Sequence, residues 1–178
     1  MLSNISNADN GVESVNLPFV FQWRGQVNFT QVVVDSNGAV FPGGISDLGG
    51  PYSAITVWYQ ELDPTVARNI YVATVHDVFV ISWESVSQYD GMVKNGLNFQ
   101  VALHAGGNIE IRWGDGNPPT DFDASGVAGI EDDGVGVAVY PTDFPFGNEK
   151  DFGVAASFPF NQCRAFVVTA TSNYAESP

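Results

Sequence analysis

The sequence is poor in cysteine, in basic side chains and in histidine. The single cysteine, Cys163, cannot form a disulfide within the chain, so it is either a small buried hydrophobic residue or the partner of a cysteine in another module. Six lysine and arginine residues stand against twenty acidic ones, a formal charge of −14. Nucleic-acid binding is therefore disfavoured, because phosphate contact needs clustered basic residues. His76 and His104 are isolated at predicted turns, which makes zinc binding unfavourable and predicts surface turn residues.

Long hydrophobic runs are also missing. None is long enough to cross a bilayer, so membrane insertion is not expected. Residues 1–14 are polar and lack the apolar centre of a signal peptide, so either the protein is not secreted or this chain is a mature or excised domain. We expect residues 1–14 to form a flexible N-terminal arm and residues 170–178 a frayed C-terminal tail.

Apolar residues are nevertheless abundant, at 44% of the chain, and the clearest pattern lies at residues 97–115. Apolar and polar residues alternate on both sides of Ala105–Asn108, which predicts a β-hairpin with one buried face. The residues expected in the core are Phe99, Val101, Ile109 and Ile111. Gly106 or Gly107 should hold a positive φ, because glycine does so at little cost.

Short strand patterns recur along the chain, separated by glycine- and proline-rich turns, and no convincing helix is present. The expected strands are 15–21, 28–34, 39–41, 53–62, 69–75, 78–83, 126–130, 135–140, 155–160 and 164–169. Pro18 marks the first as an edge strand, and Trp23–Gln26 reads as a turn. The strand 53–62 is expected to be buried, with Ile55, Val57 and Tyr59 on one face and Trp58 on the other. The pattern predicts an all-β protein, an antiparallel, jelly-roll-like β-sandwich in a single domain over residues 15–169.

Motifs of known enzyme classes are missing, so we expect no catalytic activity. Glycosidases need two carboxylates in an aromatic cleft, and two candidate groups exist: Glu61 with Asp63, and Glu84 near Trp83 and Tyr89. An acidic chain offers many such groups by chance.

The loop at residues 114–126 is the best metal candidate. Asp115, Asn117, Asp121 and Asp123 offer the oxygen ligands that calcium takes, although an ordinary turn-rich loop explains them as well. No cofactor is required by this interpretation. Asn4 and Asn28 fit the N-glycosylation pattern, which has meaning only if the chain is secreted in a eukaryote.

Five segments resemble, in order, those of the nidogen-like (NIDO) extracellular domain of nidogen, tectorin and plexin-domain-containing proteins. They are LPFVFQWRGQVNFTQVVVDSNGAVF, ITVWYQELDPTVARNIYV, FVISWESVSQYD, LNFQVALHAGGNIEIRWGD and ASGVAGIEDDG, within residues 15–140. The resemblance implies an antiparallel sandwich used in adhesion and matrix assembly at the cell surface or outside the cell, with no catalytic residues to carry over. Residues 57–59 depart from the family, which often has proline and a single aromatic there.

Three hypotheses for function follow. The first is a non-catalytic extracellular interaction module that binds protein partners through loops and edge strands, the longest loops being residues 42–51, 85–96 and 114–125. The second is a self-assembling subunit of a filament, sheet or shell, in which copies pair through edge strands or through the N-terminal arm. The third is a carbohydrate-binding or carbohydrate-cleaving sandwich that stacks glycans on Trp58, Trp83 or Trp113, although core packing suits Trp83 and Trp113 better.

Overall fold

The computed structural model describes residues 5, 10–23, 27–44, 53–65, 70–89, 97–113, 127–132, 135–139, 154–158 and 169–172. All regular elements in these residues are strands. They are β1 (Val12–Trp23), β2 (Val27–Asp35), β3 (Ala39–Pro42), β4 (Ser53–Tyr59), β5 (Leu62–Asp63), β6 (Ile70–Val75), β7 (Val78–Gln88), β8 (Leu97–His104), β9 (Ile109–Trp113), β10 (Val127–Asp132), β11 (Val135–Val139), β12 (Val154–Phe158) and β13 (Thr169–Ser172).

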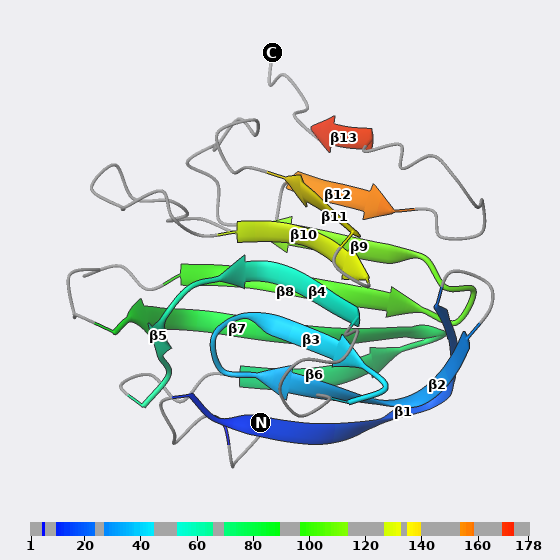
Figure 1. Ribbon diagram of the computed structural model, residues 1–178, viewed down its shortest axis with the longest axis horizontal. Helices are drawn as coiled ribbons and strands as arrows, with labels where there is room; N and C mark the ends of the chain where they lie inside the picture. The colour runs from blue at the N-terminus through cyan, green and yellow to red at the C-terminus, as the bar shows by residue number, and fades with distance from the viewer. Residues whose placement is uncertain are drawn as a thin grey trace.

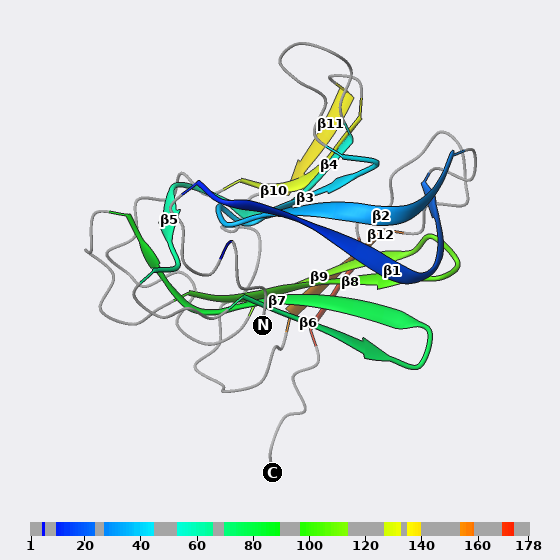
Figure 2. The same ribbon diagram turned by 90° about the horizontal axis from the view of Figure 1, so that it is seen from below.

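The described strands form two antiparallel sheets packed face to face (Figures 1 and 2). Sheet 1 has the order β1-β2-β3-β4-β10-β11. Sheet 2 has the order β13-β12-β9-β8-β7-β5, and β6 also pairs with β7. The chain leaves sheet 1 after β4 and enters sheet 2 at β5, so residues 60–63 are a crossover between the layers. The predicted antiparallel β-sandwich is confirmed.

The predicted hairpin of residues 97–115 is confirmed as β8 and β9, and it lies in the middle of sheet 2. Phe99, Val101, Ile109 and Ile111 are fully buried, as the alternation predicts. Gly107 holds the positive φ, at 87°, whereas Gly106 does not.

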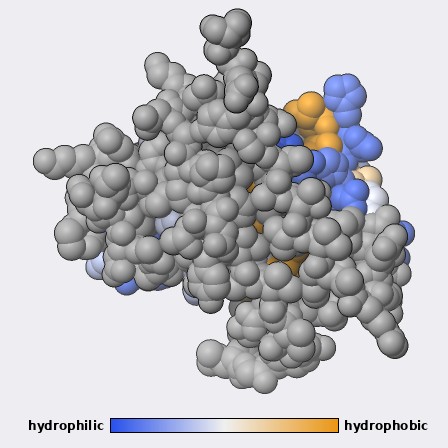
Figure 3. Space-filling model, turned by 90° about the horizontal axis from the view of Figure 1, so that it is seen from above, coloured by the Kyte–Doolittle hydropathy of each residue, from blue (hydrophilic) through white to orange (hydrophobic). Residues whose placement is uncertain are grey.

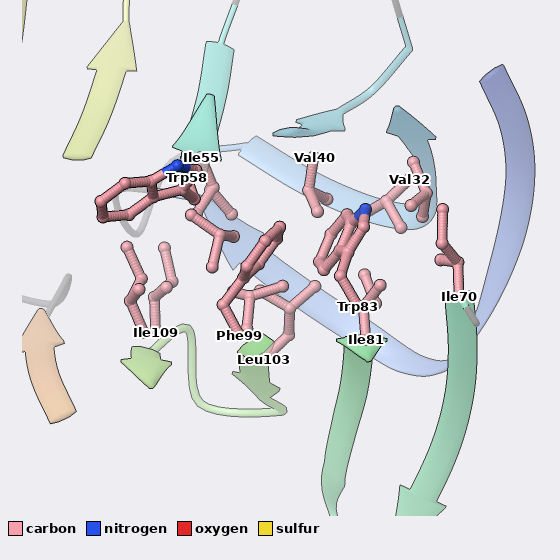
Figure 4. Close-up of a cluster of buried hydrophobic side chains, with 14 of the residues drawn as sticks. Val32, Val40, Ile55, Trp58, Ile70, Ile81, Trp83, Phe99, Leu103 and Ile109 are labelled. Atoms are coloured by element: carbon pink, nitrogen blue, oxygen red, sulfur yellow. The ribbon is translucent and has the colours of Figure 1, made fainter. Parts of the chain in front are cut away.

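The core lies between the sheets, where side chains from both layers interdigitate (Figure 4). Trp83 of β7 stacks on Phe99 of β8, with ring centroids 5.1 Å apart and an interplanar angle of 24°. Val32 and Val40 face this pair from sheet 1 (Figure 4). Trp83 and Phe99 are among the largest fully buried side chains, so their burial contributes strongly to folding.

The N-terminal part of the chain is more ordered than the sequence predicts. Strand β1 begins at Val12, inside the predicted arm, and it continues to Trp23, which we expected in a turn and which is 2% exposed. Ile5 is fully buried as part of the same apolar cluster. At the other end of the chain, β13 covers residues 169–172 and so overlaps the predicted tail. The division into arm, domain and tail otherwise stays a prediction.

The expected faces of β4 were wrong at Tyr59 and Trp58. Trp58 is fully buried, whereas Tyr59 is 46% exposed. The cause is a β-bulge: Tyr59 pairs with Val127 and Thr56 with Gly129, so Val57 and Trp58 together oppose a single residue of β10. A bulge adds one residue to a strand and reverses the alternation beyond it, which turns both Val57 and Trp58 towards the core.

Candidate functional site

Several predicted site residues lie outside the described part of the chain. These are the calcium candidates Asp115, Asn117, Asp121 and Asp123, the glycosylation candidate Asn4, and Cys163. Asn28 lies in β2 and is exposed. Within the described ranges, no group of three or more His, Cys, Asp or Glu side chains is placed to hold a metal ion.

The tryptophans proposed as glycan platforms serve the core where their side chains are described. Trp58 and Trp83 are both fully buried. The indole N–H of Trp58 donates to Gln60 Oε1 (3.1 Å), and that of Trp83 donates to the Asp35 carbonyl oxygen across the sandwich (3.3 Å). A glycan cannot reach either ring, so a stacking role for Trp58 or Trp83 is wrong.

His76 lies at the surface in a turn, as the sequence predicts, whereas His104 is half-buried and belongs to strand β8 rather than to the turn. His76 occupies the exposed two-residue turn between β6 and β7 and has a φ of 58°. His104 ends β8, and its Nε2 lies 3.2 Å from Glu110 Oε1. Arg112 contacts the other oxygen of Glu110 and donates to it from Nε at 3.2 Å.

The candidate carboxylates do not form an aromatic cleft around Glu84. Its Oε1 accepts a hydrogen bond from Ser82 Oγ (3.1 Å), which in turn accepts one from Gln100 Nε2 (3.1 Å). The neighbouring Trp83 points into the core. Glu84 therefore belongs to a polar row along the outer face of sheet 2, and the local bonding accounts for its position.

The turn Asp35–Gly38 is a buried polar junction between the two sheets. Ser36 is fully buried and Asn37 is 8% exposed. Ser36 exchanges hydrogen bonds with Gly11 through its backbone N–H (2.9 Å) and its hydroxyl (3.0 Å), and Asn37 Nδ2 donates to Asn10 Oδ1 (2.7 Å). Buried polar groups must be paired in this way to avoid a desolvation cost.

Two backbone features hold this junction in place. Gly38 has a φ of +85°, and a Cβ built there would lie 2.5 Å from the Trp58 carbonyl oxygen. Only glycine fits such an approach. The Gly38 carbonyl accepts from the N–H groups of Val57 (2.9 Å) and Trp58 (3.4 Å), so the turn also fixes the bulge of β4. Burial raises the pKa of the Asp35 carboxyl, while a hydrogen bond from the Asn37 N–H opposes that shift.

Asn37 also anchors the crossover from sheet 1 to sheet 2. Its carbonyl oxygen accepts from the Gln60 N–H (3.3 Å), and its side-chain Oδ1 accepts from the Leu62 N–H (2.9 Å). Leu62 is fully buried and pairs with Gln88 of β7. One position further, the Tyr89 N–H donates to the Glu61 carbonyl oxygen (3.2 Å). The crossover backbone is thus held from both sheets.

Three exposed side chains lie on the crossover or directly beside it, and we name them the crossover patch: Tyr59, Glu61 and Tyr89. Tyr59 and Tyr89 are 46% and 54% exposed, and Glu61 is exposed. Tyr59 lies two residues before Glu61, across the bend of the chain at Gln60, and both side chains are exposed. Glu61 and Tyr89 share a face because they lie opposite each other beyond the Leu62–Gln88 pair.

The sequence contained a signal for this patch that the alternation argument missed. The alternation places Tyr59 on the face of Ile55 and Val57, yet the residue two positions later is the charged Glu61. A charged residue in phase with Tyr59 indicates the solvent side. The other exposed large apolar side chains of the described residues are single valines: Val12, Val20, Val27 and Val75. Seen from above, a group of hydrophobic atoms at the upper right lies among hydrophilic ones (Figure 3).

Comparison with known families decides the identity. The family described as NIDO related matches residues 1–145 of the chain. This chain belongs to the NIDO-related family. The resemblance seen in the sequence is confirmed, and the match covers β1 through β11.

The NIDO-related family indicates an extracellular module of the adhesion or matrix type. No curated protein and no solved structure matches the chain. The described part of this NIDO-related chain contains no helix long and apolar enough to cross a membrane.

Proposed function

We propose that this NIDO-related chain is a non-catalytic interaction module that acts outside the cell or at the cell surface. The observation that carries the proposal is the family match over residues 1–145. Members of such families act through exposed loops and surfaces on a rigid sandwich. The buried junction at Asp35–Gly38 and the aromatic core provide such a rigid frame here.

The bonding of the candidate acids supports a non-catalytic role. Glu84 is bonded to Ser82 within the polar row, and Asp63 Oδ1 accepts from the backbone N–H and the hydroxyl of Thr65. Local hydrogen bonds thus account for the positions of both carboxylates. A catalytic pair would instead converge on a cleft with room for substrate.

The proposal is tested by replacing whole loops and single acids separately. The expected loops overlap the ends of β3 and β7, so the replaced segments are limited to residues 45–51, 90–96 and 114–125. Each is replaced by a Gly-Ser linker of equal length, and circular dichroism confirms the fold. Binding to a panel of purified matrix proteins is measured by surface plasmon resonance. Loss of binding in at least one loop variant, with Glu84→Gln unchanged, supports the module. Turnover of a glycan or peptide substrate that is abolished by Glu84→Gln or Glu61→Gln alone would establish an enzyme instead.

A second candidate function is self-assembly, and one observation favours it. Strand β6 (Ile70–Val75) forms an unbroken ladder with β7, carries no charge or proline, and ends in Val75, which is 56% exposed. Edge strands of natural proteins usually carry a charge, a proline or a bulge that prevents pairing. Strand β1 has two of these features, Pro18 and a shift in its register with β2.

Light scattering after size-exclusion chromatography tests this candidate. If β6 pairs between copies, the protein forms oligomers that Val75→Lys disperses, while Val20→Lys on β1 leaves them intact. A monomer at all concentrations would reject self-assembly through β6. The same runs with and without calcium test the loop 114–125 as a calcium site, which stays a proposal: Asp121→Asn combined with Asp123→Asn should remove any calcium-dependent change.

A further inference from the structure

We propose that the crossover patch is a binding site for a lysine- or arginine-bearing segment of a protein partner. The inference rests on the proposed function, since it names the partner chemistry of an interaction module. Its elements are two half-exposed tyrosines and one exposed carboxylate: Glu61 lies opposite Tyr89, and Tyr59 lies two residues before Glu61.

The chemistry of the three side chains selects a cation. The face of a tyrosine ring carries negative electrostatic potential and attracts ammonium and guanidinium groups. Glu61, which lies opposite Tyr89 and two residues after Tyr59, adds a formal negative charge to the patch. A basic side chain placed over either ring therefore gains an electrostatic contact with the aromatic face and with the carboxylate together. An anionic or purely apolar ligand would leave Glu61 uncompensated.

The charge of the whole chain agrees with this choice of partner. The formal charge is −14, so a basic segment is attracted from a distance and an acidic one is repelled. The described residues include one arginine, Arg112, which is committed to Glu110 on the outer face of sheet 2. Arg112 therefore does not compete with a basic partner for the crossover patch.

The support beneath the patch suits recognition. Asn37 fixes the backbone of Gln60 and Leu62, and Glu61 accepts the bond from Tyr89, so the three side chains start from a fixed backbone. The entropy cost of ordering the site on binding is correspondingly small. Tyrosines on rigid supports are frequent binding hot spots for this reason.

The test is an NMR titration of the full chain, with ¹³C-labelled tyrosine rings, against a short acetylated peptide of alternating lysine and glycine. Two comparison peptides carry acetyl-lysine or glutamate in place of lysine. We expect the ring signals of Tyr59 and Tyr89 to shift with the lysine peptide only, and those of Tyr71 on β6 to stay in place. The methylene protons next to the lysine ammonium should move upfield, as protons above an aromatic ring do.

Matched variants separate the patch from general attraction to an acidic protein. Tyr59→Ala and Tyr89→Ala should each raise the dissociation constant about two- to fivefold, which is the range of a surface cation–π contact. Tyr59→Phe keeps the ring and should bind like the wild type. Glu61→Gln should weaken binding about two- to fivefold, whereas Asp77→Asn, the same loss of one charge at the exposed β6–β7 turn, should not change it.

Equal weakening by Glu61→Gln and Asp77→Asn, with no effect of the tyrosine substitutions, would overturn the proposal in favour of non-specific attraction. Absence of any shift at Tyr59 and Tyr89 would overturn it as well. Neither result would affect the loop-replacement experiment with matrix proteins, so failure of this site and failure of the proposed function can be told apart.

Discussion

Two adjacent glycines in the β8–β9 turn should respond to alanine in opposite directions. Gly107 has a φ of +87°, and a Cβ built on it would lie 2.4 Å from the carbonyl oxygen of Gln22 in β1. Gly106 does not hold a positive φ, and a Cβ there meets no atom within 4 Å. The pair is a matched experiment within one turn, because hydrophobicity and helix or strand preference change equally at both positions.

The size of the effect follows from two costs at Gly107. Holding alanine in the left-handed region costs about 1–2 kcal/mol. Moving the β8–β9 turn away from the backbone of β1 adds about 1–3 kcal/mol, as overpacking does elsewhere. Alanine also lowers the conformational entropy of the unfolded chain, which stabilises the folded state by about 0.4–1 kcal/mol. Gly107→Ala should therefore destabilise the protein by about 2–4 kcal/mol, whereas Gly106→Ala keeps only the favourable last contribution and should stabilise it.

Urea denaturation followed by tryptophan fluorescence measures both changes, because Trp23, Trp58 and Trp83 are buried and report on unfolding. In a chain of this size the Gly107 variant should melt about 4–16 °C below the wild type, at about 2–4 °C for each kcal/mol. Equal stability of the two variants, or a Gly107 variant as stable as the wild type, would refute the contact between the β8–β9 turn and β1.

Three further predictions concern the core, the positive φ of Ser85 in β7 and the buried junction. Phe99→Ala removes the ring that stacks on Trp83 at 5.1 Å and should lower the free energy of unfolding by about 3–5 kcal/mol in urea; an unchanged melting temperature would contradict the assigned register. Ser85 holds a φ of 53°, so Ser85→Gly should raise the free energy of unfolding by about 0.5–1 kcal/mol in the same assay, and a loss would show that the serine is unstrained. The raised pKa of Asp35 means that the folded state binds this proton more tightly than the unfolded state, so its contribution to stability falls as pH rises from the ordinary aspartate pKa to the folded pKa. Asp35→Asn removes this pH-dependent contribution. The free energy of unfolding of the variant minus that of the wild type should therefore be higher at pH 7 than at pH 3. A difference that grows on acidification would contradict the prediction.

The sequence predicted the strands well because their signals are local. Strands β8 and β9 alternate between apolar and polar residues on both sides of a glycine-rich turn, and their pairing needs no information from distant residues. The same holds for the β6–β7 hairpin, where Val75 pairs with Val78 around a two-residue turn. Period-two patterns of this kind determine which face is buried.

The errors arose where a distant contact changes the local pattern. The bulge at Val57 and Trp58 depends on the Gly38 carbonyl, nineteen or more residues away, and it reverses the exposure expected for Tyr59. Trp23 reads as a turn residue in isolation, but pairing with Val27 extends β1 to include it. The crossover patch depends on two such distant contacts: the bulge turns Tyr59 outward, and the pairing of β5 with β7 brings Glu61 opposite Tyr89.

The buried position of Asn37 has a consequence for the chemical lifetime of the chain. Asparagine followed by glycine is the pair most open to deamidation in a flexible chain, because the unhindered glycine nitrogen attacks the side-chain carbonyl. Here the Gly38 N–H donates to the Asp35 carbonyl (3.2 Å), while the Asn37 amide is held by Leu62 at one atom and Asn10 at the other. Conversion to aspartate would replace the donor facing Asn10 Oδ1 with a second acceptor and so break the contact. The folded state thus protects the residue that joins its two sheets, and each unfolding event exposes that residue to irreversible ageing.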